Sequence, residues 1–181
     1  MPTYIAMLRG INVSGQKSIR MEQLRGMFEA MGLQQVTTYI QSGNVIFESE
    51  PSEPSGLETQ IEEAIKHTFG YDVPVLIRAT SEMEAILAAN PFPPSSDSGA
   101  KLYVTLLANK PAPEAVTKLQ SVQNDVDQFY VVDRQVYIVS MNYGKSKFSN
   151  TFIEKKLGVK ATTRNWETMC KLSQLAVGGG E

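Results

Sequence analysis

Three polar loops of this sequence contain residue types that bind anions, and each of them precedes a predicted helix. The first loop, residues 10–18, reads Gly-Ile-Asn-Val-Ser-Gly-Gln-Lys-Ser. A phosphate-binding P-loop needs two glycines five residues apart, followed at once by Lys and then by Ser or Thr. Gly10 and Gly15 have that spacing, but Gln16 displaces Lys17 by one position, so the loop is not a Walker motif. Two interpretations remain: its backbone N–H groups face an anion near a helix N-terminus, or its glycines only turn the chain.

The second loop, residues 142–147, reads Asn-Tyr-Gly-Lys-Ser-Lys. Its Gly-Lys-Ser matches the end of a P-loop, but Val139 stands where the first glycine should be. Taken alone, Lys145 is therefore weak support for a phosphate site. Two such loops in front of helices nevertheless favour an anion site somewhat more than one does.

The third loop is residues 162–166, Thr-Thr-Arg-Asn-Trp. Arg164 could bind a carboxylate or a phosphate through two parallel hydrogen bonds. Thr163 or Asn165 would suit the N-cap of the last helix. Arg9, which follows an apolar run, is either a solvated strand end or a cation placed for binding.

Familiar catalytic and metal-binding sets are absent from the sequence. His67 is the single histidine and lies off the apolar side of its predicted helix, and Cys170 is the single cysteine. One residue of each type gives no basis for a Ser-His-Asp or Cys-His arrangement, nor for a zinc site. We expect no metal and no cofactor, and whether the protein is an enzyme stays open.

The 181 residues, 42% of them hydrophobic, suffice for a substantial core in one domain or in two small joined ones. The formal net charge of -2 argues against binding nucleic acid mainly through its phosphates. The apolar run near the N-terminus is interrupted at Arg9, too early for a signal peptide or a membrane span. We therefore expect a cytoplasmic protein without a membrane partner; no oligomeric state follows from the sequence.

Hydrophobic periodicity in the first half predicts the order β-α-β-β-α-β, which is the ferredoxin-like pattern. A hairpin is indicated by Gln41-Ser42-Gly43-Asn44 between two β-rich runs. Residues 51–56 are expected to form a surface loop. The predicted strands cover residues 5–8, 36–40, 45–47 and 73–77, and the predicted helices cover residues 21–31 and 57–68.

The second half repeats the order β-α-β-β-α, without convincing residue-by-residue similarity to the first. Its last strand is either short, at residues 159–162, or missing, and a final helix follows. We expect an α+β protein that forms one compact unit over residues 1–181. Its predicted parts are a first ferredoxin-like half at 1–79, a connector helix and Pro/Ser-rich loop at 80–100, a second half with the C-terminal helix at 101–177, and a flexible tail at 178–181.

Four segments, spread in order along nearly the whole chain, form a specific combination of motifs: Leu8-Arg9-Gly10-Ile11-Asn12-Val13, Val36-Thr37-Thr38-Tyr39-Ile40-Gln41-Ser42-Gly43-Asn44-Val45, Asn90-Pro91-Phe92 and Thr163-Arg164-Asn165-Trp166. Together they resemble the bacterial domain-of-unknown-function 1697 family. The resemblance implies two intertwined ferredoxin-like subdomains with antiparallel sheets, and it implies no activity. Ser14 departs from the family pattern, where a second glycine often stands beside Gly15.

Because binding sites are usually built from loops and strand ends, we predict that the polar residues of these motifs converge on one cleft between the halves. The predicted ligand-binding residues are Arg9, Asn12, Lys17, Ser42, Asn44, Lys145, Arg164 and Asn165. The leading hypothesis is a binding module for a small anionic or phosphate-bearing ligand such as a nucleotide.

Two alternatives remain beside this binding module. One is an enzyme that stabilises an anionic substrate with Arg and Lys. The other is a protein- or nucleic-acid-interaction module with an exposed sheet face, which would carry aromatic residues. The candidates for that face are Tyr39, Phe47, Tyr103 and Tyr137.

Overall fold

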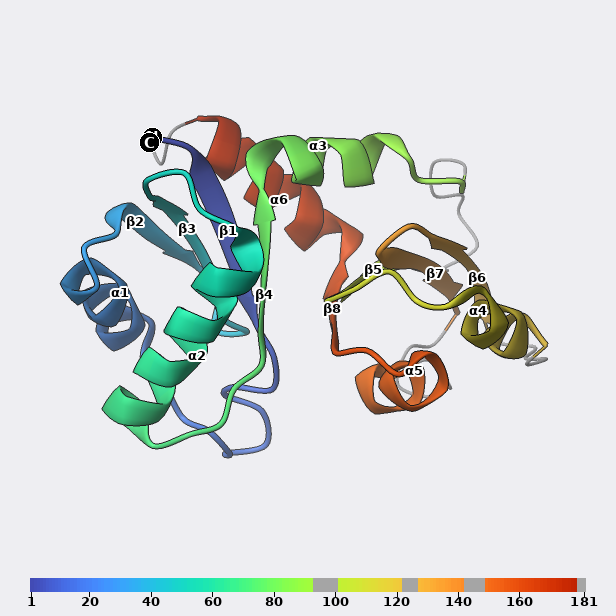
Figure 1. Cartoon of the computed structure of the whole chain (residues 1–181), viewed down its shortest axis with the longest axis horizontal. Coiled ribbons are helices and arrows are strands. Elements are labelled where there is room, and N and C mark those ends of the chain that lie inside the picture. Colours follow the sequence, from blue (N-terminus) through green and yellow to red (C-terminus); the bar gives the residue numbers. More distant parts are fainter. Residues whose placement is uncertain (93–100, 122–126, 142–148, 179–181) are drawn as a thin grey trace. The chain divides into compact units, whose positions relative to one another are not determined.

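The structure, a computed structural model, describes residues 1–92, 101–121, 127–141 and 149–178. The chain is an α+β protein with two four-stranded antiparallel sheets (Figure 1). It divides into unit 1, which is Met1–Ala85 with Cys170–Glu181, and unit 2, which is Ile86–Met169. None of the helices in the described ranges is long and apolar enough to cross a membrane.

Unit 1 has the predicted β-α-β-β-α-β order, with sheet order β2-β3-β1-β4. Its fourth strand begins two residues later than predicted, at Val75. Its second helix begins at Pro54, inside the predicted loop, because proline suits the first turn of a helix. The elements are β1 (Thr3–Leu8), α1 (Met21–Ala30), β2 (Gln34–Tyr39), β3 (Asn44–Glu48), α2 (Pro54–Phe69) and β4 (Val75–Ala79), followed by α3 (Thr80–Ala88).

One face of this sheet is covered by α1 and α2 (Figure 1). Side chains alternate along β1, so Tyr4, Ala6 and Leu8 lie in the core beneath the helices. Phe47 of β3 meets Phe28 of α1 in an edge-on ring contact, with centroids 5.5 Å apart. The residues between these positions, Ile5 and Met7, are also buried, so β1 is apolar on both faces, unlike a strand of a half-exposed antiparallel sheet.

Unit 2 has sheet order β6-β7-β5-β8. The final strand of the repeat exists, and it lies at Ala161–Asn165 rather than at residues 159–162. Thr163 and Arg164 are therefore strand residues, and the predicted loop at 162–166 is wrong. The elements are β5 (Lys101–Leu107), α4 (Pro113–Gln120), β6 (Asp127–Val132), β7 (Gln135–Ser140), α5 (Asn150–Leu157) and β8 (Ala161–Asn165), followed by α6 (Trp166–Val177), which ends in unit 1.

The two sheets match position by position, although the sequence showed a repeat of element order alone. Residues 4–8 pair with 79–75 in unit 1, and residues 103–107 pair with 165–161 in unit 2. The central hairpin strands correspond in the same way, 44–47 to 135–138. The two sheets share the same strand register although their side chains differ. The register determines which positions are buried and how side chains alternate between the faces, but it does not determine which residue stands at each position.

Carboxylates from helices accept the outward N–H groups of the edge strands β4 and β8. In β4, Ile77 donates to Glu58 at 2.8 Å and Val75 donates to Glu62 at 3.2 Å. The equivalent bond in β8 joins Ala161 to Glu154 at 3.0 Å. An edge strand with free N–H groups is a template for pairing with another chain, so these carboxylates protect the sheets from edge-to-edge association.

Replacing Glu58 by Ala should lower the free energy of unfolding by about 1–3 kcal/mol, because it leaves a part-buried N–H of Ile77 without its acceptor. The variant should also aggregate faster. Urea denaturation and light scattering measure the two effects. Glu63→Ala, an exposed position on the same helix, is the matched control. Equal behaviour of the two variants would contradict the edge-protection role.

Candidate functional site

Because the two sheets correspond, the connections between their elements can be compared, and two of them are longer in unit 1 than in unit 2. Residues 9–20 join β1 to α1, and we call them the β1 loop; residues 108–112 make the equivalent connection in unit 2. The β2–β3 turn, residues 40–43, is likewise longer than its counterpart at residues 133–134. Connections of this kind usually have about 2–6 residues, and longer loops in compact domains are often functional. The candidate site is therefore this end of the unit 1 sheet.

Asn12 holds the β1 loop to the β2–β3 turn. Its side-chain amide donates to the carbonyls of Ile19, at 2.9 Å, and Gln41, at 2.8 Å, and its side-chain oxygen accepts the N–H of Ile19 at 2.8 Å. The backbone φ of Asn12 is +55°, a left-handed conformation that asparagine tolerates better than most residues. Asn12 is thus a structural clamp that fixes the path of the loop.

The β2–β3 turn is closed from inside by Asn44. This buried amide donates to the carbonyl of Tyr39 at 3.0 Å and to Oγ of Ser42 at 3.1 Å. Gly43 has φ +92°, and a Cβ there would lie 2.7 Å from Cδ1 of Ile11 in the β1 loop. The turn therefore requires glycine both for its conformation and for its contact with the loop.

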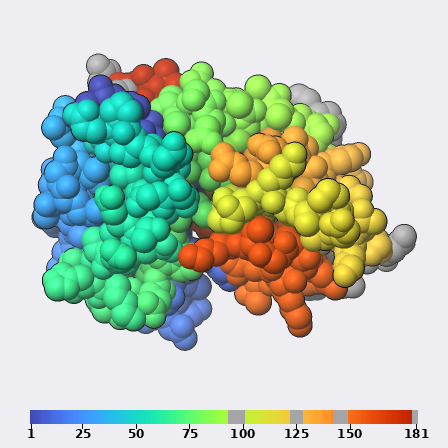
Figure 2. Space-filling model, in the orientation of Figure 1, coloured from blue at the N-terminus to red at the C-terminus, as the bar shows by residue number. Residues whose placement is uncertain are grey.

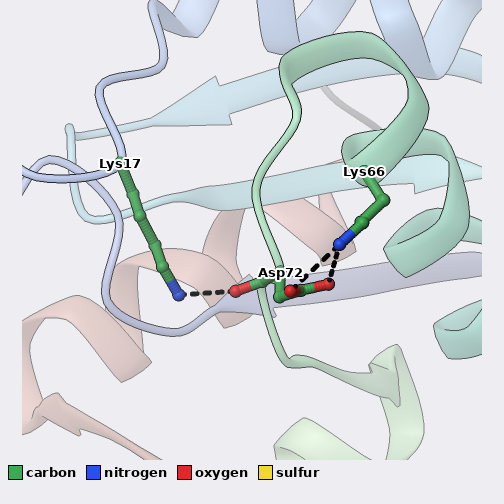
Figure 3. Close-up of polar contacts among 3 residues, drawn as sticks. All are labelled: Lys17, Lys66 and Asp72. Carbon is green, nitrogen blue, oxygen red and sulfur yellow. Dashed lines mark hydrogen bonds and ion pairs between the residues drawn. The ribbon is translucent and has the colours of Figure 1, made fainter.

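Lys17 connects the β1 loop to the segment between α2 and β4 (Figure 3). Its Nζ donates to the main-chain carbonyl of Asp72 at 2.5 Å. The Asp72 carboxylate accepts from Nζ of Lys66 at 2.9 and 3.1 Å. Asp72 thus binds two lysine ammonium groups, one through its main-chain carbonyl and one through its carboxylate. The sequence analysis did not identify Asp72 as a candidate residue. The signal available was a charged residue shortly after Gly70, which ends α2 with φ +79°.

The backbone of the β1 loop repeatedly enters the left-handed region. Its positive φ values occur at Gly10, Asn12, Ser14, Gly15 and Lys17. Successive residues that alternate between right- and left-handed conformations form concave groups of N–H donors that bind anions. Within the described part of the chain, the N–H groups of Gly10, Ser14 and Gly15 have no acceptor, and these residues are exposed. Blue atoms of this N-terminal region reach the surface at the lower end of unit 1 (Figure 2).

The predicted site residues fall into three groups. Arg9, half-buried, follows β1 and donates its N–H to the carbonyl of Pro74 at 3.0 Å. Lys145 lies outside the described residues, so the convergence of all the predicted residues on one cleft stays a prediction. Two groups remain. One lies at the end of the unit 1 sheet and consists of Arg9, Asn12, Lys17, Ser42 and Asn44; the other lies on β8 and consists of Arg164 and Asn165.

Arg164 is 8% exposed, and its guanidinium donates to Oγ1 of Thr162 and to the carbonyl of Thr163, both at 3.0 Å. Burial lowers the pKa of Arg164 to about 10, so it stays charged at neutral pH. Asn165 caps α6 by accepting the N–H of Thr168 at 2.8 Å, which selects it over Thr163 as the cap. These contacts give both residues structural roles.

Arg78, 1% exposed, was missed by the sequence analysis. It occupies the β4 position that corresponds to Arg164 in β8. A single arginine in the last strand of each predicted half was the available signal. Neither arginine presents an exposed guanidinium to solvent, and the described residues hold no group of His, Cys, Asp and Glu side chains that could bind a metal ion.

Asn12→Ala should lower the free energy of unfolding by about 2 kcal/mol or more, because it removes three hydrogen bonds and puts alanine at a positive φ. Hydrogen exchange should also become faster in residues 9–20. Asn12→Asp, which keeps the acceptor for Ile19 but loses both donated bonds, should fall between the wild type and Asn12→Ala. Unchanged exchange in both variants would refute the clamp.

The comparisons with known proteins agree with this architecture. The conserved bacterial protein SP0830 from Streptococcus pneumoniae has a similar structure over 97% of this chain and 98% of its own, with a TM-score of 0.77. The two sequences are 21% identical, so the similarity shows a shared fold. No curated protein matches the chain. The family model described as "Protein of unknown function (DUF1697)" matches residues 1–137, which include the β1 loop and the β2–β3 turn, and the chain therefore belongs to the DUF1697 family.

Proposed function

We propose that unit 1 binds a small anionic, phosphate-bearing ligand, such as a nucleotide, at the β1 loop. The observation that carries the proposal is the loop itself, which is extended in unit 1 and has a short counterpart in the otherwise matched unit 2. A connection needed just to join the strand to the helix would resemble residues 108–112. The additional residues instead supply exposed backbone donors and a positioned cation.

Three features support an anion as the occupant. The exposed N–H groups of Gly10, Ser14 and Gly15 are donors, and such groups in turn-like backbone bind anions. Lys17 is held in place by a carbonyl, so less side-chain freedom is lost when it binds an anion. The loop leads into the N-terminus of α1, where Arg20 provides no side-chain cap and the helix dipole favours negative charge.

The two alternatives have less support. An enzyme built on Arg9, Lys145 and Arg164 needs an accessible Arg164, whereas its guanidinium is buried. An interaction module needs aromatic residues on an exposed sheet face. Of the four candidates, Phe47 and Tyr137 are fully buried, whereas Tyr39 and Tyr103 are partly exposed, so that alternative stays a prediction with fewer aromatics behind it.

Calorimetric titration of the full chain with inorganic phosphate at fixed low salt tests the proposal. Lys17→Ala should weaken binding about tenfold or more, since a charge-assisted hydrogen bond contributes roughly 1.5–3 kcal/mol. The matched control is Lys110→Ala, an exposed lysine in the equivalent connection of unit 2. It should bind phosphate as the wild type does.

Two results would count against this function. One is the absence of any phosphate-dependent heat with the wild type. The other is an equal loss of affinity in the Lys17 and Lys110 variants, which would indicate non-specific screening of surface charge. Urea denaturation of Lys17→Ala verifies that the variant stays folded without its bond to Asp72.

A further inference from the structure

A hollow of about 450 Å³ lies beside the β1 loop, in unit 1. This volume falls within the roughly 300–1,000 Å³ that small-molecule sites occupy. The hollow opens to solvent between α1 and the C-terminal end of α2. Its lining residues are Ser18, Gln23, Met27, Thr68, Phe69 and Tyr71.

The lining combines two aromatic rings with an apolar floor. Phe69 and Tyr71 are partly buried and pack against the unit 1 core, which anchors their rings while leaving part of each accessible. Met27, 7% exposed, belongs to the core itself. Anchored aromatic rings with an accessible part suit the binding of a flat ring, because stacking needs little further ordering of the protein.

Polar groups surround this apolar part. Gln23 lies one helical turn before Met27 on α1, and its amide can both donate and accept hydrogen bonds. Ser18 and Thr68 add hydroxyl groups from the β1 loop and from α2. A flat ring with hydrogen-bonding heteroatoms matches this set better than a hydrocarbon does, since a hydrocarbon would leave the amide and hydroxyls without partners.

The hollow is adjacent to the cation of the proposed anion site. Lys17 precedes Ser18, and its Nζ bonds to the carbonyl of the residue that follows Tyr71. Lys66 is anchored to the carboxylate of that same Asp72 (Figure 3). The ammonium of Lys17 is therefore held at the residue next to Tyr71, on the side of the lining that the β1 loop contacts.

We infer that the hollow seats the base of a nucleoside phosphate whose phosphate group binds at Lys17 and the β1 loop. This inference rests on the proposed function and specifies its ligand class. Phe69 and Tyr71 stack on the base, the side chains of Gln23 and Thr68 hydrogen-bond to its edge, and the β1 loop binds the charge.

Titration of the full chain with inorganic phosphate, four nucleoside monophosphates (AMP, GMP, CMP and UMP) and their nucleosides tests the inference. At least one monophosphate should bind about tenfold more tightly than phosphate, as base stacking contributes roughly 1–3 kcal/mol. Tyr71→Leu should remove most of this advantage and leave the affinity for inorganic phosphate unchanged. Lys17→Ala should weaken both.

Because Tyr71 packs on the core, its replacement could unfold the protein, so a second variant with a smaller effect on packing is needed. Thr68→Ala removes an exposed hydroxyl at the hollow and should reduce nucleotide affinity about threefold or more, in the range of one lost hydrogen bond. Thr117→Ala, which changes another exposed helical threonine, in unit 2, should have no effect. Equal nucleotide affinity in these two threonine variants would count against the hollow.

The outcomes separate the two proposals. If phosphate binds through Lys17 and every monophosphate binds equally well, the inference about the hollow is overturned and the anion site stands. If nucleosides bind as tightly as their monophosphates, the phosphate contributes nothing to binding, and both the anion site and the inference that rests on it are overturned. If no probe binds, both are overturned.

Discussion

The three hydrogen bonds of the Asn12 side chain are the constraint on which the candidate site depends. The β1 loop is anchored in the unit 1 core by the buried side chains of Ile11 and Ile19, but the residues between them are mostly polar and exposed. Asn12 adds directed contacts to both the loop and the β2–β3 turn, which hold this polar stretch where apolar packing is missing. The positions of Lys17, Ser18 and the exposed backbone donors follow from it, and so does the approach of the loop to the hollow.

The remainder of unit 1 supplies the rigid support that such a loop needs. Strands β1, β3 and β4 are buried on both faces, and the β4 edge of the sheet is closed by carboxylates of α2. These contacts constrain the backbone at Arg9 and Pro74, from which the β1 loop and the segment bearing Asp72 extend. A site on loops is most accurately positioned where the strands that carry them cannot move.

The matched sheets also show that some polar residues of the motifs make structural contacts of their own. Arg78 and Arg164 occupy corresponding strand positions and are both buried, in a sequence where the two halves share little else. The guanidinium of Arg164 donates hydrogen bonds to the Thr162 hydroxyl and to the main-chain carbonyl of Thr163. A buried charge is costly unless it is hydrogen-bonded, and these contacts of Arg164 meet that requirement.

The sequence by itself determined the α+β class, the repeated element order and the family, because hydrophobic periodicity and turn residues act over short stretches of chain. It also located the β1 loop and the β2–β3 turn through their glycines and asparagines. Only the tertiary structure decided that Asn12 and Asn44 are clamps, that Arg164 is a buried strand residue, and that Lys66 and Asp72 join Lys17. The contacts of Asn12 with Gln41 and of Lys17 with Asp72 join residues 29 and 55 positions apart, and the burial of Arg164 depends on the packed fold, so local patterns do not encode them.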